Sequence, residues 1–273
     1  VNGSTLNLYE GQIAGNNGRE NSTSYERYGG GVYVIGGTFN MYGGTIKNNK
    51  SYGGSGAGVY VEKNGNFIMK NTASVTGNMI GYGSTAGYGG GVYVNDGTFT
   101  MNGNASVSGN KATNGGGVYA SVVGKFNMNG NASITGNTAN GVFVNGGTFT
   151  VSNTPTVTGN TGKSGREDDV SNVYLAGGDT ITIGGKLDAG ASIGVTKGAG
   201  GVNSVIATGA KEDYSGKFFV DDNKYKVGYD ETHKQLVLAE KDTTAETHTH
   251  CLCGKTHTAI GDHKTEQEVT FAT

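Results

Sequence analysis

The chain contains 273 residues, of which 52 are glycine, one is proline and none is tryptophan. Glycine averages about 7% of residues in ordinary proteins, but the strict Gly-X-Y period that a collagen triple helix requires is absent. The formal net charge is −2 and the apolar runs are short, which excludes a basic surface for nucleic acid and a membrane-spanning helix in this chain.

The first residues already belong to a repeat. Leu6-Asn7-Leu8 and Ile13-Ala14-Gly15-Asn16 match the last two thirds of the copies that follow them. The sequence starts at Val1 and has no signal peptide. We therefore expect a fragment, most simply a monomeric module of a larger chain.

Three short motifs then recur in a fixed order. The first motif has a valine followed by an aromatic residue in every copy, and its valines are Val32, Val59, Val92, Val118, Val142 and Val173. The second motif follows 7 or 8 residues later, at Phe39, Phe67, Phe99, Phe126, Phe149 and Ile181. The third motif follows after another 7 or 8 residues, at Ile46, Val75, Val107, Ile134 and Val157.

Each copy predicts three short strands separated by turns. Apolar and polar residues alternate within each motif, as in a strand, and Gly and Asn supply the turn conformations. A copy of roughly 25 residues cannot bury a core alone, whereas stacked copies can. The sequence therefore predicts an all-β fold, a right-handed, single-stranded parallel β-helix over residues 1–196, with three strands per coil and about seven coils. A β-propeller needs longer blades, and a leucine-rich repeat needs more leucine.

Stacking in register predicts columns of equivalent residues. The valines of the first motif and the phenylalanines of the second should line the core. The turn asparagines should form a ladder whose amides hydrogen-bond from coil to coil, and its members are Asn16, Asn78, Asn110, Asn137 and Asn160.

An aromatic row should stand on the outer surface, because its members alternate with the inward valines. The row consists of Tyr33, Tyr60, Tyr93, Tyr119, Phe143 and Tyr174. Aromatic pairs across strands stiffen a sheet, and exposed rings also mark interaction surfaces. The second interpretation makes the row a candidate binding site for a glycan or a surface protein. A threonine row beside the Phe column, which includes Thr98 and Thr100, resembles an ice-binding face, but Lys125 interrupts it.

Catalytic groups do not gather in the repeats. Carboxylates such as Glu62 and Asp96 do not recur at one strand position, and Glu167-Asp168-Asp169 is a loop cluster. No histidine precedes His233, so a histidine-based triad cannot form within the coils. We therefore expect no enzymatic activity and no required cofactor.

The repeat stops after residue 196. Four short strands are expected at 202–207, 217–220, 225–229 and 235–239. Since the open end of a β-helix is an aggregating edge, residues 197–240 should form a small β cap that covers it.

Residues 241–273 are predicted to be a Cys/His-rich linker module. Thiolate and imidazole groups at short spacing are typical zinc ligands. The candidate ligands of a structural zinc ion are His250, Cys251, Cys253, His257 and His263. The alternatives are a disordered linker with free thiols and a Cys251–Cys253 disulfide.

The unit GGGVYV…GTFTMNGNASVSGN at 89–110 resembles the glycine-rich repeats of adhesin-like, right-handed β-helix surface proteins of bacteria. It is also similar to the repeats of polymorphic outer-membrane proteins. The resemblance covers residues 1–195, and the segments at 216–240 and 248–254 look like the capping and Cys/His pieces that follow such helices. It implies the pectin-lyase-like superfamily and an extracellular, structural or adhesive module of the cell surface. A polysaccharide lyase or hydrolase of the pectate-lyase-like kind is the alternative.

Overall fold

The computed structural model describes residues 1–18, 28–52, 54–81, 87–162, 169–222 and 224–241, and the backbone of two further strands. The chain divides into two compact units, Val1–Ala239 and Glu240–Thr273. In the second unit the strands β28 (Glu246–His248) and β29 (His257–Ala259) form an antiparallel pair.

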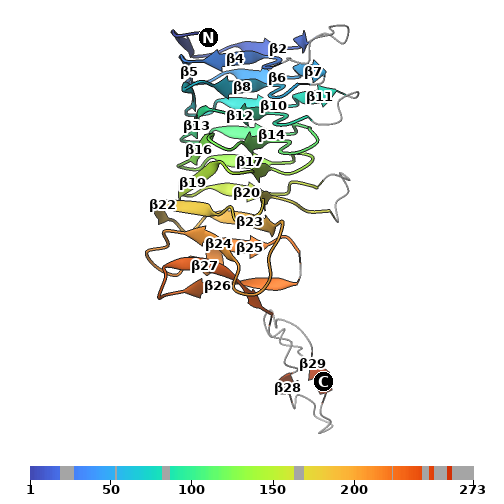
Figure 1. Ribbon diagram of the computed structural model, residues 1–273, viewed down its shortest axis with the longest axis vertical. Helices are drawn as coiled ribbons and strands as arrows, with labels where there is room; N and C mark the ends of the chain where they lie inside the picture. Colours follow the sequence, from blue (N-terminus) through green and yellow to red (C-terminus); the bar gives the residue numbers. More distant parts are fainter. Residues whose placement is uncertain are drawn as a thin grey trace, which may run out of the picture. The chain divides into compact units, whose positions relative to one another are not determined.

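The first unit is a stack of coils whose strands pair in parallel with those of the next coil (Figure 1). The second motif forms a 10-stranded sheet in the order β1 (Thr5–Leu8), β5 (Thr38–Met41), β9 (Gly65–Met69), β13 (Gly97–Met101), β16 (Lys125–Met128), β19 (Thr148–Asn153), β22 (Ile181–Leu187), β24 (Val205–Thr208), β27 (Gln235–Glu240) and β26 (Tyr225–Asp230).

The first and third motifs share a 14-stranded sheet. The strands of the third motif are β2 (Gln12–Ala14), β6 (Thr45–Lys47), β10 (Ser74–Thr76), β14 (Ser106–Ser108), β17 (Ser133–Thr135) and β20 (Thr156–Thr158). Those of the first motif are β4 (Val32–Ile35), β8 (Val59–Glu62), β12 (Val92–Val94), β15 (Val118–Ala120), β18 (Val142–Val144) and β21 (Val173–Leu175). The two columns merge at β23 (Ser192–Lys197), which pairs with both β20 and β21.

A third, 3-stranded sheet lies beyond the turn asparagines and consists of β3 (Asn17–Gly18), β7 (Lys50–Tyr52) and β11 (Met79–Gly81). The three parallel sheets are those of a right-handed parallel β-helix with about three strands per coil, which confirms the predicted fold class. No helix among the described residues is long and apolar enough to cross a membrane.

The core columns predicted from the motif spacing are present. The rings of the Phe column are fully buried, and consecutive centroids lie 4.7–5.3 Å apart with planes tilted by only 3–10°. This spacing matches the distance of about 4.8 Å between paired strands. The column consists of Phe39, Phe67, Phe99, Phe126 and Phe149, and a buried methionine row lies two residues after it in the first four of these coils.

The asparagine ladder is longer than predicted. Each side-chain oxygen accepts the main-chain N–H and the amide of the asparagine in the preceding coil, at 2.9–3.1 Å. Its members are Asn16, Asn49, Asn78, Asn110, Asn137, Asn160 and Asn172, all but the first buried. Asp221 ends the ladder, because its carboxylate accepts the N–H and the amide of Asn172 at 2.7 and 2.6 Å.

The end of the helix departs from the repeat gradually. Parallel pairing continues past residue 196, since β24 pairs with β22 and β25 (Phe218–Val220) pairs with β23. A single 3-10 turn, η1 (Ser215–Lys217), precedes β25. Among the paired strands of this unit, pairing first becomes antiparallel where β27 meets β24. An antiparallel strand cannot continue the coil, so the parallel stack ends there.

Replacing Asn110 with alanine should destabilise the fold strongly. The variant leaves the buried N–H of Asn78 without its acceptor and the carbonyl of Val75 without its donor, and each unmade bond of this kind costs about 1–3 kcal/mol. The measurement is the denaturant midpoint of unfolding. Asn131→Ala is the matched control, because Asn131 is exposed and bonds only Asn104, and it should change stability by about 0.5 kcal/mol or less. Equal losses of stability in both variants would contradict the buried ladder as the main polar interaction that holds the coils together.

Asp221 should make stability depend on pH. Burial raises the pKa of this carboxyl above its usual range, against the opposing effect of the donors on Asn172 and Thr196. Since the folded-state pKa exceeds the unfolded value of about 3.9, the folded state binds the proton more tightly. This contribution to stability is complete below pH 4 and is lost as pH rises through the folded pKa. Melting temperatures of wild type and Asp221→Asn should therefore diverge across that window, and parallel curves would refute the assignment.

Candidate functional site

The outer aromatic row is a continuous stack of rings along the coils. Strand register places the six members directly over one another on β4, β8, β12, β15, β18 and β21. Consecutive centroids lie 4.6–5.3 Å apart, and all neighbours stack except Tyr33 and Tyr60, which meet edge to face. The rings lie outside the core because the buried aliphatic residues on either side of each ring face inward.

The expectation that every ring of the row is exposed is wrong for two members. Tyr60 and Tyr119 are only 3% and 5% exposed. A second layer covers them: Tyr28 lies 4.4 Å from Tyr60, and Tyr88 lies 4.8 Å from Tyr119, between ring centroids. The interior of the row is therefore packed between other rings and contributes to stability.

The covering tyrosines occupy one corner position, four residues before the inward valine, in alternate coils. Strand bridges place Tyr28 beside Ser55 and Tyr88 beside Asn114. Each covering ring contacts a ring of the row in the next coil, Tyr28 with Tyr60 and Tyr88 with Tyr119. The covering tyrosines can be recognised in the sequence because each directly precedes three glycines, as Tyr28-Gly29-Gly30-Gly31 and Tyr88-Gly89-Gly90-Gly91.

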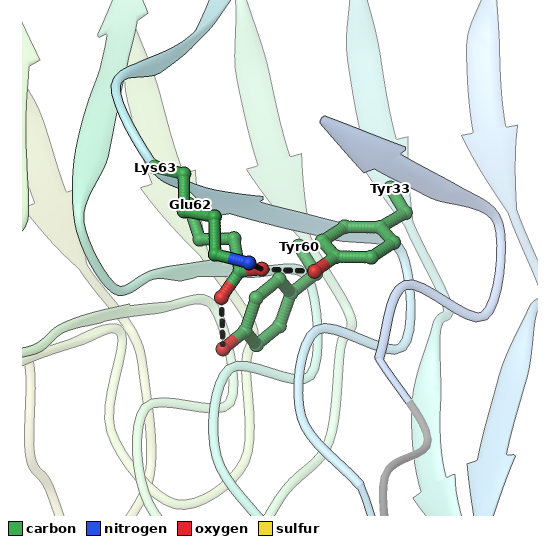
Figure 2. Close-up of polar contacts among 4 residues, drawn as sticks. All are labelled: Tyr33, Tyr60, Glu62 and Lys63. Carbon is green, nitrogen blue, oxygen red and sulfur yellow. Dashed lines mark hydrogen bonds and ion pairs between the residues drawn. The ribbon is translucent and has the colours of Figure 1, made fainter. Parts of the chain in front are cut away.

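A polar row holds the phenol hydroxyls in place. Figure 2 shows the hydroxyls of Tyr33 and Tyr60 directed at the carboxylate of Glu62. The hydroxyl of Tyr33 donates to one oxygen, that of Tyr60 to the other at 3.4 Å, and the ammonium of Lys63 lies 3.8 Å from the first oxygen. Farther along, the amide of Asn145 donates to the hydroxyl of Tyr119 at 2.8 Å. The residue three positions after the valine thus orients the rings, a role that sequence reasoning missed.

Recesses open at the two ends of the row. At the N-terminal end, Tyr28, Tyr33, Tyr60, Glu62, Lys63 and Asn95 line a recess of about 460 Å³. At the C-terminal end, a hollow of about 470 Å³ is lined by Asn114, Asn140, Phe143, Gly162, Asp169, Val170, Ser171, Tyr174 and Thr196. Both recesses therefore place concave space next to an aromatic ring of the row.

The predicted zinc ligands of the tail fall where side chains are not described. His250, Cys251, Cys253 and His263 lie outside the described residues, and His257 begins β29, of which only the backbone is described. Elsewhere in the described part of the chain, no group of three or more His, Cys, Asp or Glu side chains could hold a metal ion. The zinc site stays a prediction. Of the acidic loop cluster, only Asp169 lies among the described residues.

No protein-family model matches the chain, and neither the curated proteins nor the solved structures provide a match.

The packed tyrosines should resist ionisation. Burial raises the pKa of Tyr60, Tyr93 and Tyr119, and the charge of Glu62 raises that of Tyr60 further. Alkaline titration followed by tyrosinate absorbance should show part of the 15 tyrosines still protonated well above the ordinary pKa of about 10. Because their folded-state pKa is raised, the folded state should lose stability as pH rises above 10. Glu62→Gln should lower the pKa of Tyr60, and complete titration near pH 10 in the folded protein would contradict the packing.

Proposed function

We propose that this chain is a structural and adhesive module of a bacterial cell-surface protein, without enzymatic activity, that binds a glycan or a protein at the ends of its outer aromatic row. The observation that carries the proposal is a ring row outside the core with a recess at each end. Aromatic side chains with polar neighbours in a concave site are typical of ligand recognition.

The scaffold favours an adhesive role. Register fixed by buried amides and stacked rings holds surface side chains at constant spacing from coil to coil. Such a surface is organised before binding, so little conformational entropy is lost when a partner docks. The resemblance of residues 1–195 to adhesin-like repeats supports an extracellular location.

The alternative is a polysaccharide lyase or hydrolase. Glycoside hydrolysis commonly uses two carboxylates that flank the bond. Among the described residues, the lining of each recess contains one carboxylate, Glu62 or Asp169. The carboxylate of Glu62 already accepts hydrogen bonds from two phenols. These features favour binding over hydrolysis.

A glycan array tests the proposal with the whole chain. The double variant Tyr33→Ala/Tyr174→Ala removes the terminal ring at both ends and should weaken binding at least tenfold. Thr100→Ala, an outward residue of β13 on a different sheet, is the control and should bind like wild type. Melting temperatures establish that all three proteins are folded. Equal binding by the double variant and the wild type would contradict the proposed site.

A further inference from the structure

Asn145 and Gly146 form an exposed Asn-Gly turn at the corner between the first and second motifs. An Asn-Gly pair can modify itself, because the glycine nitrogen can attack the side-chain amide carbon of the asparagine and close a five-membered succinimide ring. Glycine has no side chain that would hinder this ring closure. The chain contains several such pairs, so the surroundings of each pair determine how fast it reacts.

Neighbouring coils hold both reacting groups of this turn. The amide nitrogen of Asn145 donates to the hydroxyl of Tyr119 in the preceding coil at 2.8 Å. The main-chain N–H of Gly146 donates to the carboxylate of Asp179 in the next coil, also at 2.8 Å. The main-chain oxygen of Asp179 in turn accepts from the ammonium of Lys197 at 2.5 Å. The nitrogen that would attack is therefore hydrogen-bonded to a group that can accept its proton.

A second Asn-Gly turn has the same arrangement with one difference. The amide of Asn129 donates to Asn102 in the preceding coil at 3.2 Å. Gly130 and Gly146 both have a positive φ, of 68° and 76°. The N–H of Gly130 also donates to a side chain of the next coil, but its acceptor is the amide oxygen of Asn153, at 3.3 Å. An amide oxygen accepts a hydrogen bond, whereas a carboxylate can also take up the proton.

We propose that Asn145-Gly146 is a self-modification site at which Asp179 acts as the general base. The nitrogen of Gly146 bonds to Cγ of Asn145 while the bond from Cγ to Nδ2 breaks. The proton that Gly146 loses passes through Asp179 to the departing nitrogen, which leaves as ammonia. Water then opens the succinimide to an aspartate or isoaspartate at position 145, and Asp179 is again a carboxylate.

The product changes the polar surroundings of the aromatic row. Asn145 now donates to the hydroxyl of Tyr119, whereas a carboxylate at the same position would accept from it, as Glu62 does from Tyr33 and Tyr60. A negative charge beside a phenol also raises the pKa of the phenol. Because the ammonia diffuses away, the reaction would convert a neutral part of the outer surface into an anionic one, in one direction only.

The test is incubation of the whole folded chain at neutral pH, followed by peptide mapping with mass spectrometry, which measures aspartate and isoaspartate at each asparagine. Asn145 should convert at least about tenfold faster than Asn129, below the full range of general-base effects because a carboxylate is a weak base. Asp179→Asn keeps the shape and a hydrogen-bond acceptor, and it should slow Asn145 to the rate of Asn129. An unchanged rate of Asn145 in Asp179→Asn would overturn the proposal.

The reciprocal variant, Asn153→Asp, puts a carboxylate at the acceptor position of Gly130. It should raise the rate of Asn129 at least about tenfold and leave the rate of Asn145 unchanged. This gain can be measured even if Asp179→Asn does not fold, and circular dichroism before and after incubation establishes which proteins are folded. If Asn129 reacts no faster in this variant, a carboxylate at this position is not the base and the proposal fails.

Discussion

The hydrogen bonds of the buried asparagines determine how one coil sits on the next. Within the ladder, the oxygen of each asparagine after the first accepts two donors from the preceding coil, as that of Asn137 does from Asn110. From Asn49 to Asn160, the amide nitrogen also donates to a main-chain carbonyl one coil back, as Asn110 does to Val75. The ladder therefore ties three consecutive coils together at one corner. Because a register slip by one residue would turn every inward side chain outward, this corner also fixes the positions of the Phe column and the aromatic row.

In this fold, the side chain that follows the last member of a column differs in chemistry from the members of the column. The asparagine ladder ends at the carboxylate of Asp221, which accepts from Asn172 as an asparagine oxygen would. The aromatic row ends where Thr196 follows Tyr174 in register. Within a column, each side chain is satisfied by its own kind in the next coil, so little is left for a ligand. At the ends the partner is of another kind: Asp221 in place of an asparagine, and Thr196 in place of an aromatic ring.

The spacing of 7 or 8 residues was enough to predict the fold, the core columns and most of the ladder, because in-register stacking follows directly from a regular repeat. Asn49 was missed because Asn48 occupies the turn position that glycine takes in the other coils, with a φ of 53°, and so obscured the alignment. Asp221 lies 49 residues from Asn172, outside any repeat. The covering role of Tyr28 and Tyr88 depends on corner segments of variable length, where sequence offsets do not give position.

The burial of Tyr60 and Tyr119 changes how an aromatic stripe on a β-helix should be interpreted. When every coil contributes a ring, the rings stack on one another and form a second packed layer outside the core. Hydroxyls of the row also bond Glu62 and Asn145 and do not point toward a partner. Native structures pair nearly all buried polar atoms, and this fold pairs a whole ladder of buried amides. Among the described residues, the side-chain oxygen of Asn114 and the hydroxyl of Tyr229 are buried and have no hydrogen-bond partner. Along its interior the stripe therefore serves packing, and the recesses beside Tyr33 and Tyr174 are where concave space meets a ring of the row.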